Sequence, residues 1–176
     1  MFEKMKGYII YMIFISIITI PIFLIPVFFY NSQIFEDTQG YYTVFCHQIT
    51  SRSYCYFPDS NQIENCYDSS EFNPSKESIV EKSTGTGYKF PVCARDTGFY
   101  LFAFLGGIAL FFLKKYKSDY VPHPIWLILA IIPMALDGGT QLIGLQESTN
   151  IIRFTTGAIA GIALPFYMVP ILNRFF

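Results

Sequence analysis

Charged side chains are scarce in this 176-residue sequence, and their charges nearly cancel. Asp, Glu, Lys and Arg together make up 14% of the chain, and the formal net charge is −1. Proteins that bind nucleic acid need clustered Lys and Arg to neutralise phosphates, and no such basic stripe occurs here. The sequence also lacks an internal repeat and an Asn-x-Ser/Thr acceptor for glycosylation. These absences exclude a nucleic-acid partner and a repeat architecture.

Apolar residues dominate the rest of the sequence. They account for 52% of the chain, with 19 Phe and 13 Tyr, which is more apolar surface than a soluble domain of this length would bury. Four stretches approach the roughly 20 residues that a helix needs to cross a hydrocarbon core of about 30 Å. They are residues 7–30, 97–113, 121–145 and 151–173. The sequence therefore predicts an all-α integral membrane protein: a bundle of four transmembrane helices forming one membrane domain, residues 1–176.

The first apolar stretch has the features of a signal anchor. Pro21 and Pro26 within it are expected to kink the helix. Residues 25–30 are bulky, whereas a cleaved signal peptide has small residues before the cut. We expect this helix to remain in the mature protein.

Basic residues predict how the helices are oriented. Lys and Arg in short loops stay on the cytoplasmic side, whereas acidic residues carry little weight. With four spans, the basic residues beside the helix ends all fall on one side: Lys4, Lys6, Lys114, Lys115, Lys117 and Arg174. We therefore expect a cytoplasmic N-terminus in the cell membrane and an extracytoplasmic loop over residues 31–96.

The long loop contains all four cysteines, Cys46, Cys55, Cys66 and Cys93. An extracytoplasmic compartment permits disulfides, and the short separation favours a bridge between Cys55 and Cys66. Cys46 and Cys93 are expected to form a second bridge or to serve as thiolate ligands of a metal. Apolar alternation in the loop is too brief to predict strands.

A set of possible metal ligands lies at the two ends of this loop. Cys46 and His47 are adjacent, and Cys93 and Asp96 are three residues apart immediately before the second span. Thiolate, imidazole and carboxylate groups together suit zinc. His47 is alternatively a general base or an ordinary hydrogen-bonded loop residue.

Asp137 is the most informative polar residue of the spans. A third helix that begins near Pro124 places Asp137 about 20 Å along a core of about 30 Å, where an ionised carboxylate is costly and marks a candidate functional site. Gln141 lies four residues later, on the same helix face. The alternative is a water-exposed turn formed by Asp137, Gly138 and Gly139.

Two arginines are candidate partners for an acid or a phosphate. Arg153 opens the fourth span after a short connection, so we expect it to form an ion pair with Asp137. Arg95 precedes the second span. Each is alternatively an interfacial residue whose side chain extends to water.

These polar residues form ordered motifs across most of the chain. In sequence they are Phe45-Cys46-His47-Gln48, Arg52-Ser53, Cys93-Ala94-Arg95-Asp96-Thr97-Gly98, Asp137-Gly138-Gly139-Thr140-Gln141, Ser148-Thr149-Asn150, Arg153 and Thr156-Gly157. The pattern resembles the small prokaryotic membrane proteins grouped as domain of unknown function family 2085, from about Phe45 to Gly161. The resemblance implies a prokaryotic membrane location and brings no established activity.

One position departs from the family pattern. Asp96 stands where the family has a second cysteine in Cys-Ala-Arg-Cys-Thr-Gly, so the chain lacks a Cys-x-x-Cys pair and the redox interpretation is weakened. The carboxylate of Asp96 can still serve as an anionic metal ligand, as the family's cysteine would.

Three functions fit these residues. The first is a metal-assisted hydrolase or transferase that acts on a lipid or lipid phosphate at the extracytoplasmic face, with Asp137, His47, Arg153, Arg95 and Gln141 as catalytic or substrate-positioning residues. The second is a non-catalytic carrier, lipid-binding protein or complex subunit, whose polar cluster is structural. The third is a thiol oxidoreductase coupled to a quinone.

Overall fold

A computed structural model describes residues 5–44, 46–67, 74–83 and 85–175 of the chain. Four helical segments in it are long and apolar enough to cross a membrane: Lys6–Phe28, Ala94–Phe112, Pro124–Leu142 and Asn150–Phe175. The predicted helix bundle is therefore present, with boundaries that differ by a few residues. Lys4 and Phe45, used above for the orientation and the motif pattern, lie outside the described residues.

The bundle helices are α1 (Lys6–Phe28), α3 (Ala94–Phe112), α4 (Pro124–Leu142) and the pair α5 (Asn150–Ala163) and α6 (Pro165–Phe175). Helix α1 continues through Pro21 and Pro26. The fourth span is divided at Pro165, where the proline ring removes a backbone donor and disfavours a helical residue before it.

The long loop is not irregular, and the purely all-α prediction is wrong in this part. A short helix α2 (Gln33–Tyr42) and a 3₁₀ turn (Thr50–Arg52) precede a four-stranded antiparallel sheet. Its strands are β1 (Tyr54–Phe57), β2 (Gln62–Asn65), β3 (Ile79–Lys82) and β4 (Gly85–Lys89), in the order β2-β1-β4-β3. Strands of four or five residues are too short for periodicity to distinguish them from loops.

The predicted disulfide between Cys55 and Cys66 is confirmed, and it stabilises the sheet. Cys55 lies in β1, and its side chain is buried together with Phe57 and Val80 beneath the strands. Cys66 directly follows β2, so the bridge joins the two strands of one hairpin. The loop thereby acquires a small core of its own.

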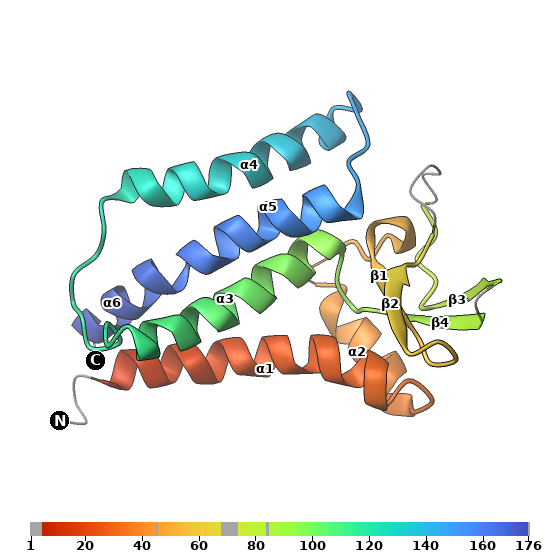
Figure 1. The fold of residues 1–176 in the computed structure, drawn as a ribbon, viewed down its shortest axis with the longest axis horizontal. Helices are drawn as coiled ribbons and strands as arrows, with labels where there is room; N and C mark the ends of the chain where they lie inside the picture. The colour runs from red at the N-terminus through yellow and green to blue at the C-terminus, as the bar shows by residue number, and fades with distance from the viewer. Residues whose placement is uncertain (1–4, 45, 68–73, 84, 176) are drawn as a thin grey trace.

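Close packing of α3 against α5 forms the centre of the bundle. Glycines on both helices allow it. The backbone of α5 lies against Gly98 of α3, and the backbone of α3 lies against Gly157 and Gly161 of α5. By contrast, α4 lies along α5 at the outside of the bundle (Figure 1), and Asp137 is its one buried residue. Most of the α4 surface is therefore exposed.

The two ends of the bundle differ in chemistry. Helix α1 begins and α6 ends at the end opposite to the sheet, and the connection from α3 to α4 turns there as well (Figure 1). We call this the basic end, because Lys6, residues 114–117 and Arg174 lie there. The other end, which carries α2 and the sheet, is called the sheet end.

Candidate functional site

A cavity of about 380 Å³ lies at the sheet end of the bundle. Its walls come from segments that are far apart in the sequence: the connection after α2, the 3₁₀ turn, the start of α3, the end of α4 and the start of α5. The polar residues that line it are Cys46, His47, Gln48, Arg52, Cys93, Arg95, Asp96, Gln141 and Arg153. Most of the residues selected from the sequence therefore meet at one cavity.

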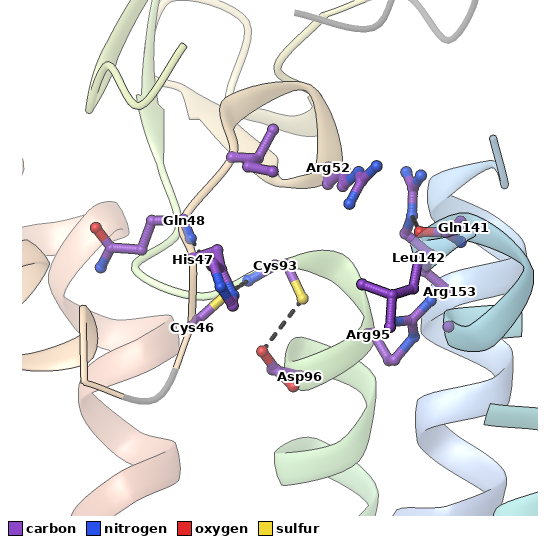
Figure 2. Close-up of a pocket in the computed structure, with 12 residues that line it drawn as sticks. Cys46, His47, Gln48, Arg52, Cys93, Arg95, Asp96, Gln141, Leu142 and Arg153 are labelled. Carbon is purple, nitrogen blue, oxygen red and sulfur yellow. Dashed lines mark hydrogen bonds between the residues drawn. The ribbon is translucent and has the colours of Figure 1, made fainter. Parts of the chain in front are cut away.

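Figure 2 shows how these side chains face one another. Cys46 and His47 lie on one side of the cavity, and Arg95 and Arg153 approach it from the other. Cys93 and Asp96 lie between them, at the first turn of α3. The helix bundle and the long loop thus each contribute one wall.

Three of the four predicted metal ligands form a compact group. One ligand atom from each of Cys46, Cys93 and Asp96 lies within 4.8 Å of the other two. The Cys93 thiol donates a hydrogen bond to Asp96 Oδ2 at 3.2 Å. His47 is exposed and lines the cavity, but it does not belong to this group among the described residues.

The thiols of Cys46 and Cys93 are free, so the second bridge is not formed in this structure. Cys46 Sγ accepts hydrogen bonds from the backbone N–H of Cys93 at 3.2 Å and of Gln48 at 3.5 Å. A hydrogen bond with the Cys93 side chain, opposed by burial, lowers the pKa of Cys46. The hydrogen bond between the two thiols and the burial of Cys93 both raise the pKa of Cys93. Cys46 is therefore the thiol that ionises first.

The loop that presents Cys46 is fixed by buried polar side chains. Gln48 has a positive φ of 54°, and its side-chain amide donates to Gln39 O at 2.6 Å and Pro91 O at 2.9 Å. Lys89 Nζ donates to Gln48 O at 2.9 Å and Lys76 O at 3.2 Å. Burial lowers the pKa of Lys89 to about 8. Nothing in the sequence around Lys89 indicates this role.

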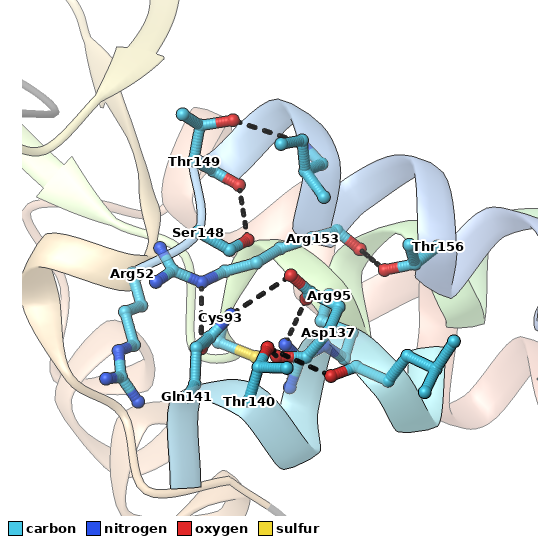
Figure 3. A network of polar contacts seen from close by, with 12 residues as sticks. Arg52, Cys93, Arg95, Asp137, Thr140, Gln141, Ser148, Thr149, Arg153 and Thr156 are labelled. Atoms are coloured by element: carbon cyan, nitrogen blue, oxygen red, sulfur yellow. Dashed lines mark hydrogen bonds and ion pairs between the residues drawn. The ribbon is translucent and has the colours of Figure 1, made fainter. Parts of the chain in front are cut away.

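Asp137 does not pair with Arg153, so that prediction is wrong. Its carboxylate forms an ion pair with Arg95 of α3 and accepts a hydrogen bond from Gln141 Nε2 at 3.2 Å. Gln141 Oε1 in turn accepts from Arg153 Nε at 3.4 Å, so the amide links the two charged residues (Figure 3). Helix α4 continues to Leu142 and Asp137 is 7% exposed, so the exposed-turn alternative is also wrong.

Arg153 is held by two further partners. Its Nη1 donates to Asn150 Oδ1 at 2.9 Å, and its Nη2 forms an ion pair with Glu147 at 2.9 Å. Asn150 Nδ2 lies 3.3 Å from Ser53 O and 3.0 Å from Asn65 Oδ1, so it joins the start of α5 to the sheet. Nothing in the sequence distinguishes Glu147, because an acid in a short exposed connection resembles any surface residue.

Comparison with known proteins identifies the family of this chain. It is 36% identical over 173 residues to Uncharacterized protein MJ1492 of Methanocaldococcus jannaschii, an alignment that covers 94% of this chain and 92% of the relative. The chain belongs to the DUF2085 family. The model of this family, described as a predicted membrane protein, matches residues 83–167. The resemblance to this family and the membrane location are therefore confirmed.

A second relative aligns over a shorter region. An uncharacterized protein of Methanothermobacter thermautotrophicus is 46% identical over 79 residues, which cover 44% of this chain and 68% of that protein. No solved structure matches the chain. The family region of residues 83–167 includes Cys93, Asp96 and Arg153 of the cavity, but not Cys46 or His47.

Proposed function

We propose that this DUF2085 protein is a metal-assisted hydrolase or transferase that acts on a lipid or lipid phosphate at the sheet end of the bundle. One observation carries the proposal: the ligand atoms of Cys46, Cys93 and Asp96 lie within 4.8 Å of one another in a cavity also lined by three arginines. Two thiolates and a carboxylate suit zinc, and arginines bind the oxygens of phosphates.

The arrangement of Cys46 supports metal binding. Ligands of one zinc ion lie roughly 2.0–2.3 Å from the metal, so a group spread over 4.8 Å needs only a small contraction. The two backbone N–H groups that donate to Cys46 Sγ resemble the outer contacts that orient metal thiolates. Three protein ligands leave a fourth tetrahedral position for water or substrate.

The other residues of the cavity have roles in this proposal. Cys46, Cys93 and Asp96 would hold the metal ion, which would supply a Lewis acid and a water of lowered pKa for hydrolysis of a phosphate ester. His47 would carry a proton from the attacking water to the leaving alcohol. Arg95, Arg153 and Gln141 hold the phosphate oxygens. Asp137 positions Arg95 and Gln141, because both pair with its carboxylate.

Access from the bilayer supports a lipid substrate. Leu142, the last residue of α4, lines the cavity and is 88% exposed. At the end of a membrane-spanning helix, such an exposed apolar side chain would contact lipid acyl chains, so the polar cavity would lie beside the hydrocarbon region. A lipid headgroup would enter the cavity while its chains remain in the membrane.

Metal analysis of the purified protein tests the proposal. We expect about one zinc or related ion per chain under non-chelating conditions, loss of the metal in Cys93→Ser and Asp96→Asn, and retention in Asp96→Cys, which restores the cysteine of the family pattern. Leu142→Ala, which changes the cavity wall without removing a ligand, is the matched control. A wild-type protein without stoichiometric metal, or an Asp96→Asn variant that binds metal as wild type does, contradicts the proposal.

A second candidate function is non-catalytic, and the contacts of Asn150 favour it. Its amide joins α5 to the sheet and to Arg153, so the polar residues satisfy one another as a structural network would. In that case Asp137→Asn or Arg153→Gln lowers the yield of folded protein. For an enzyme, Asp137→Asn gives a well-folded protein with little activity.

A further inference from the structure

Two arginines at the rim of the cavity share a single carboxylate. Arg52 Nη2 lies 2.7 Å from Glu147 Oε1, and Arg153 Nη2 lies 2.9 Å from Glu147 Oε2. Each carboxylate oxygen is thus bound by a different guanidinium, one from the 3₁₀ turn of the loop and one from the first turns of α5. We call Arg52, Arg153 and Glu147 the rim triad.

We propose that Arg52 and Arg153 form the binding site for a phosphate monoester, and that Glu147 occupies this site when no ligand is bound. This inference rests on the proposed function for its substrate. It adds Arg52 as a residue that determines specificity and Glu147 as a side chain that competes with the phosphate for the two arginines. The oxygens of a phosphate group accept from guanidinium groups as carboxylate oxygens do. The phosphate would therefore replace the Glu147 carboxylate.

Charge in the rim triad favours a ligand that is more negative than a carboxylate. Glu147 brings one negative charge to Arg52 and Arg153. A phosphate monoester carries nearly two negative charges at neutral pH, so it would attract the two guanidinium groups more strongly than Glu147 does.

Arg153 is held in place independently of Glu147. Asn150 Oδ1 accepts from its Nη1 at 2.9 Å, Gln141 Oε1 accepts from its Nε at 3.4 Å, and the side chain is only 5% exposed. A guanidinium that is fixed on its other nitrogens needs little reorganisation to bind a ligand.

Glu147, in contrast, has few restraints. It lies in the connection between α4 and α5, its side chain is 48% exposed, and among the described residues its carboxylate contacts only the two arginines. Rotation of this side chain toward solvent therefore opens the site without disturbing α4 or α5.

The rim triad lies beside the proposed metal ligands. Arg52 and Arg153 line the same cavity as Cys93 and Asp96 (Figure 2). A cavity of about 380 Å³ is large enough for a headgroup rather than a whole lipid. Arg95 lines the same cavity, and its Nε is buried without a hydrogen-bond partner in the described structure, so it is a further donor for an anionic ligand.

Binding of two phosphate sources to the full-length protein tests the inference. The probes are inorganic phosphate added to protein in neutral-lipid nanodiscs, and phosphatidic acid incorporated in such nanodiscs, both at fixed ionic strength. We expect Glu147→Gln, which keeps the shape and removes the competing charge, to bind at least one probe roughly ten-fold more tightly than wild type. Arg52→Gln should lose most of the binding. Glu36→Gln, which removes an exposed carboxylate on α2, is the matched control and should behave as wild type.

The outcomes separate this inference from the proposed function. Tighter binding of phosphatidic acid alone identifies a lipid headgroup, and tighter binding of inorganic phosphate as well identifies the anion itself; both support the site. If neither probe binds more tightly to Glu147→Gln than to Glu36→Gln, the inference is wrong even when the protein contains its metal. If the purified protein contains no metal and Glu147→Gln still binds a probe more tightly than wild type, the phosphate site is supported and the metal-assisted reaction is rejected.

Discussion

Replacing Gly157 by alanine should separate the two central helices of the bundle. A Cβ atom at this position would lie 2.0 Å from the carbonyl oxygen of Arg95 and 3.2 Å from the backbone N of Phe99. The obstacle is backbone, so rotation of a side chain does not relieve it. Helices α3 and α5 would have to separate by about 1 Å, and Gly98 and Gly161 beside the same interface would lose their close contacts.

The expected loss of stability follows from two opposing effects. Overpacking typically costs about 1–3 kcal/mol, and the backbone obstacle at Gly157 places the cost near about 3 kcal/mol, whereas alanine gains about 1 kcal/mol over glycine in helix propensity. The net destabilisation is about 2 kcal/mol, which corresponds to a fall in melting temperature of roughly 5 °C for a chain of this size. Thermal unfolding of the purified protein, followed by circular dichroism in one detergent, measures it.

Gly139→Ala is the matched control, because a Cβ atom there has no neighbour within 4 Å. It has the same gain in helix propensity without a clash, so its melting temperature should equal or exceed that of wild type. Gly157→Ala should also bind less metal, since Arg95 and Asp96 lie on the turn of α3 that is displaced. Equal melting temperatures for the two variants would refute the close-packing argument.

Three further predictions concern the sheet and the orientation. Replacing both Cys55 and Cys66 by serine removes the bridge across 11 residues and should cost about 3 kcal/mol, measured by denaturant unfolding; an unchanged midpoint would mean that the bridge does not restrain the unfolded chain. Burial lowers the pKa of Lys89 from 10.5 to about 8, so above pH 8 the unfolded chain binds more protons than the folded chain. The free energy of unfolding should therefore rise by at most about 2 kcal/mol between about pH 8 and 9.5. In Lys89→Met, denaturant unfolding should show no such rise. The orientation is tested in a chain in which the free cysteines Cys46 and Cys93 are replaced by serine. With a cytoplasmic N-terminus, a cysteine introduced there at exposed Ser60 should react with an impermeant maleimide in intact cells and one at exposed Lys115 should not; the reverse pattern contradicts the orientation.

The residue pattern is sufficient to predict the helices and many of the residues that line the cavity. Apolar runs of about 20 residues indicate membrane spans because an unpaired backbone is too costly in lipid. Asp137 was selected because a carboxylate inside a span needs a partner, and the short separation of Cys55 and Cys66 favoured their bridge. Each of these arguments uses residues that are near one another in the chain.

Partners that come from distant segments were decided only by the tertiary structure. The sequence favoured Arg153 for Asp137 because α4 and α5 are consecutive, but the rotation of α4 brings Asp137 to Arg95 of α3. The strands of the loop become stable only by pairing with one another over a shared buried face. The sequence by itself determined where the chain enters the membrane and which polar residues are costly there. Helix rotation and strand pairing depend on contacts between distant residues, so only the folded chain determined which of those polar residues meet.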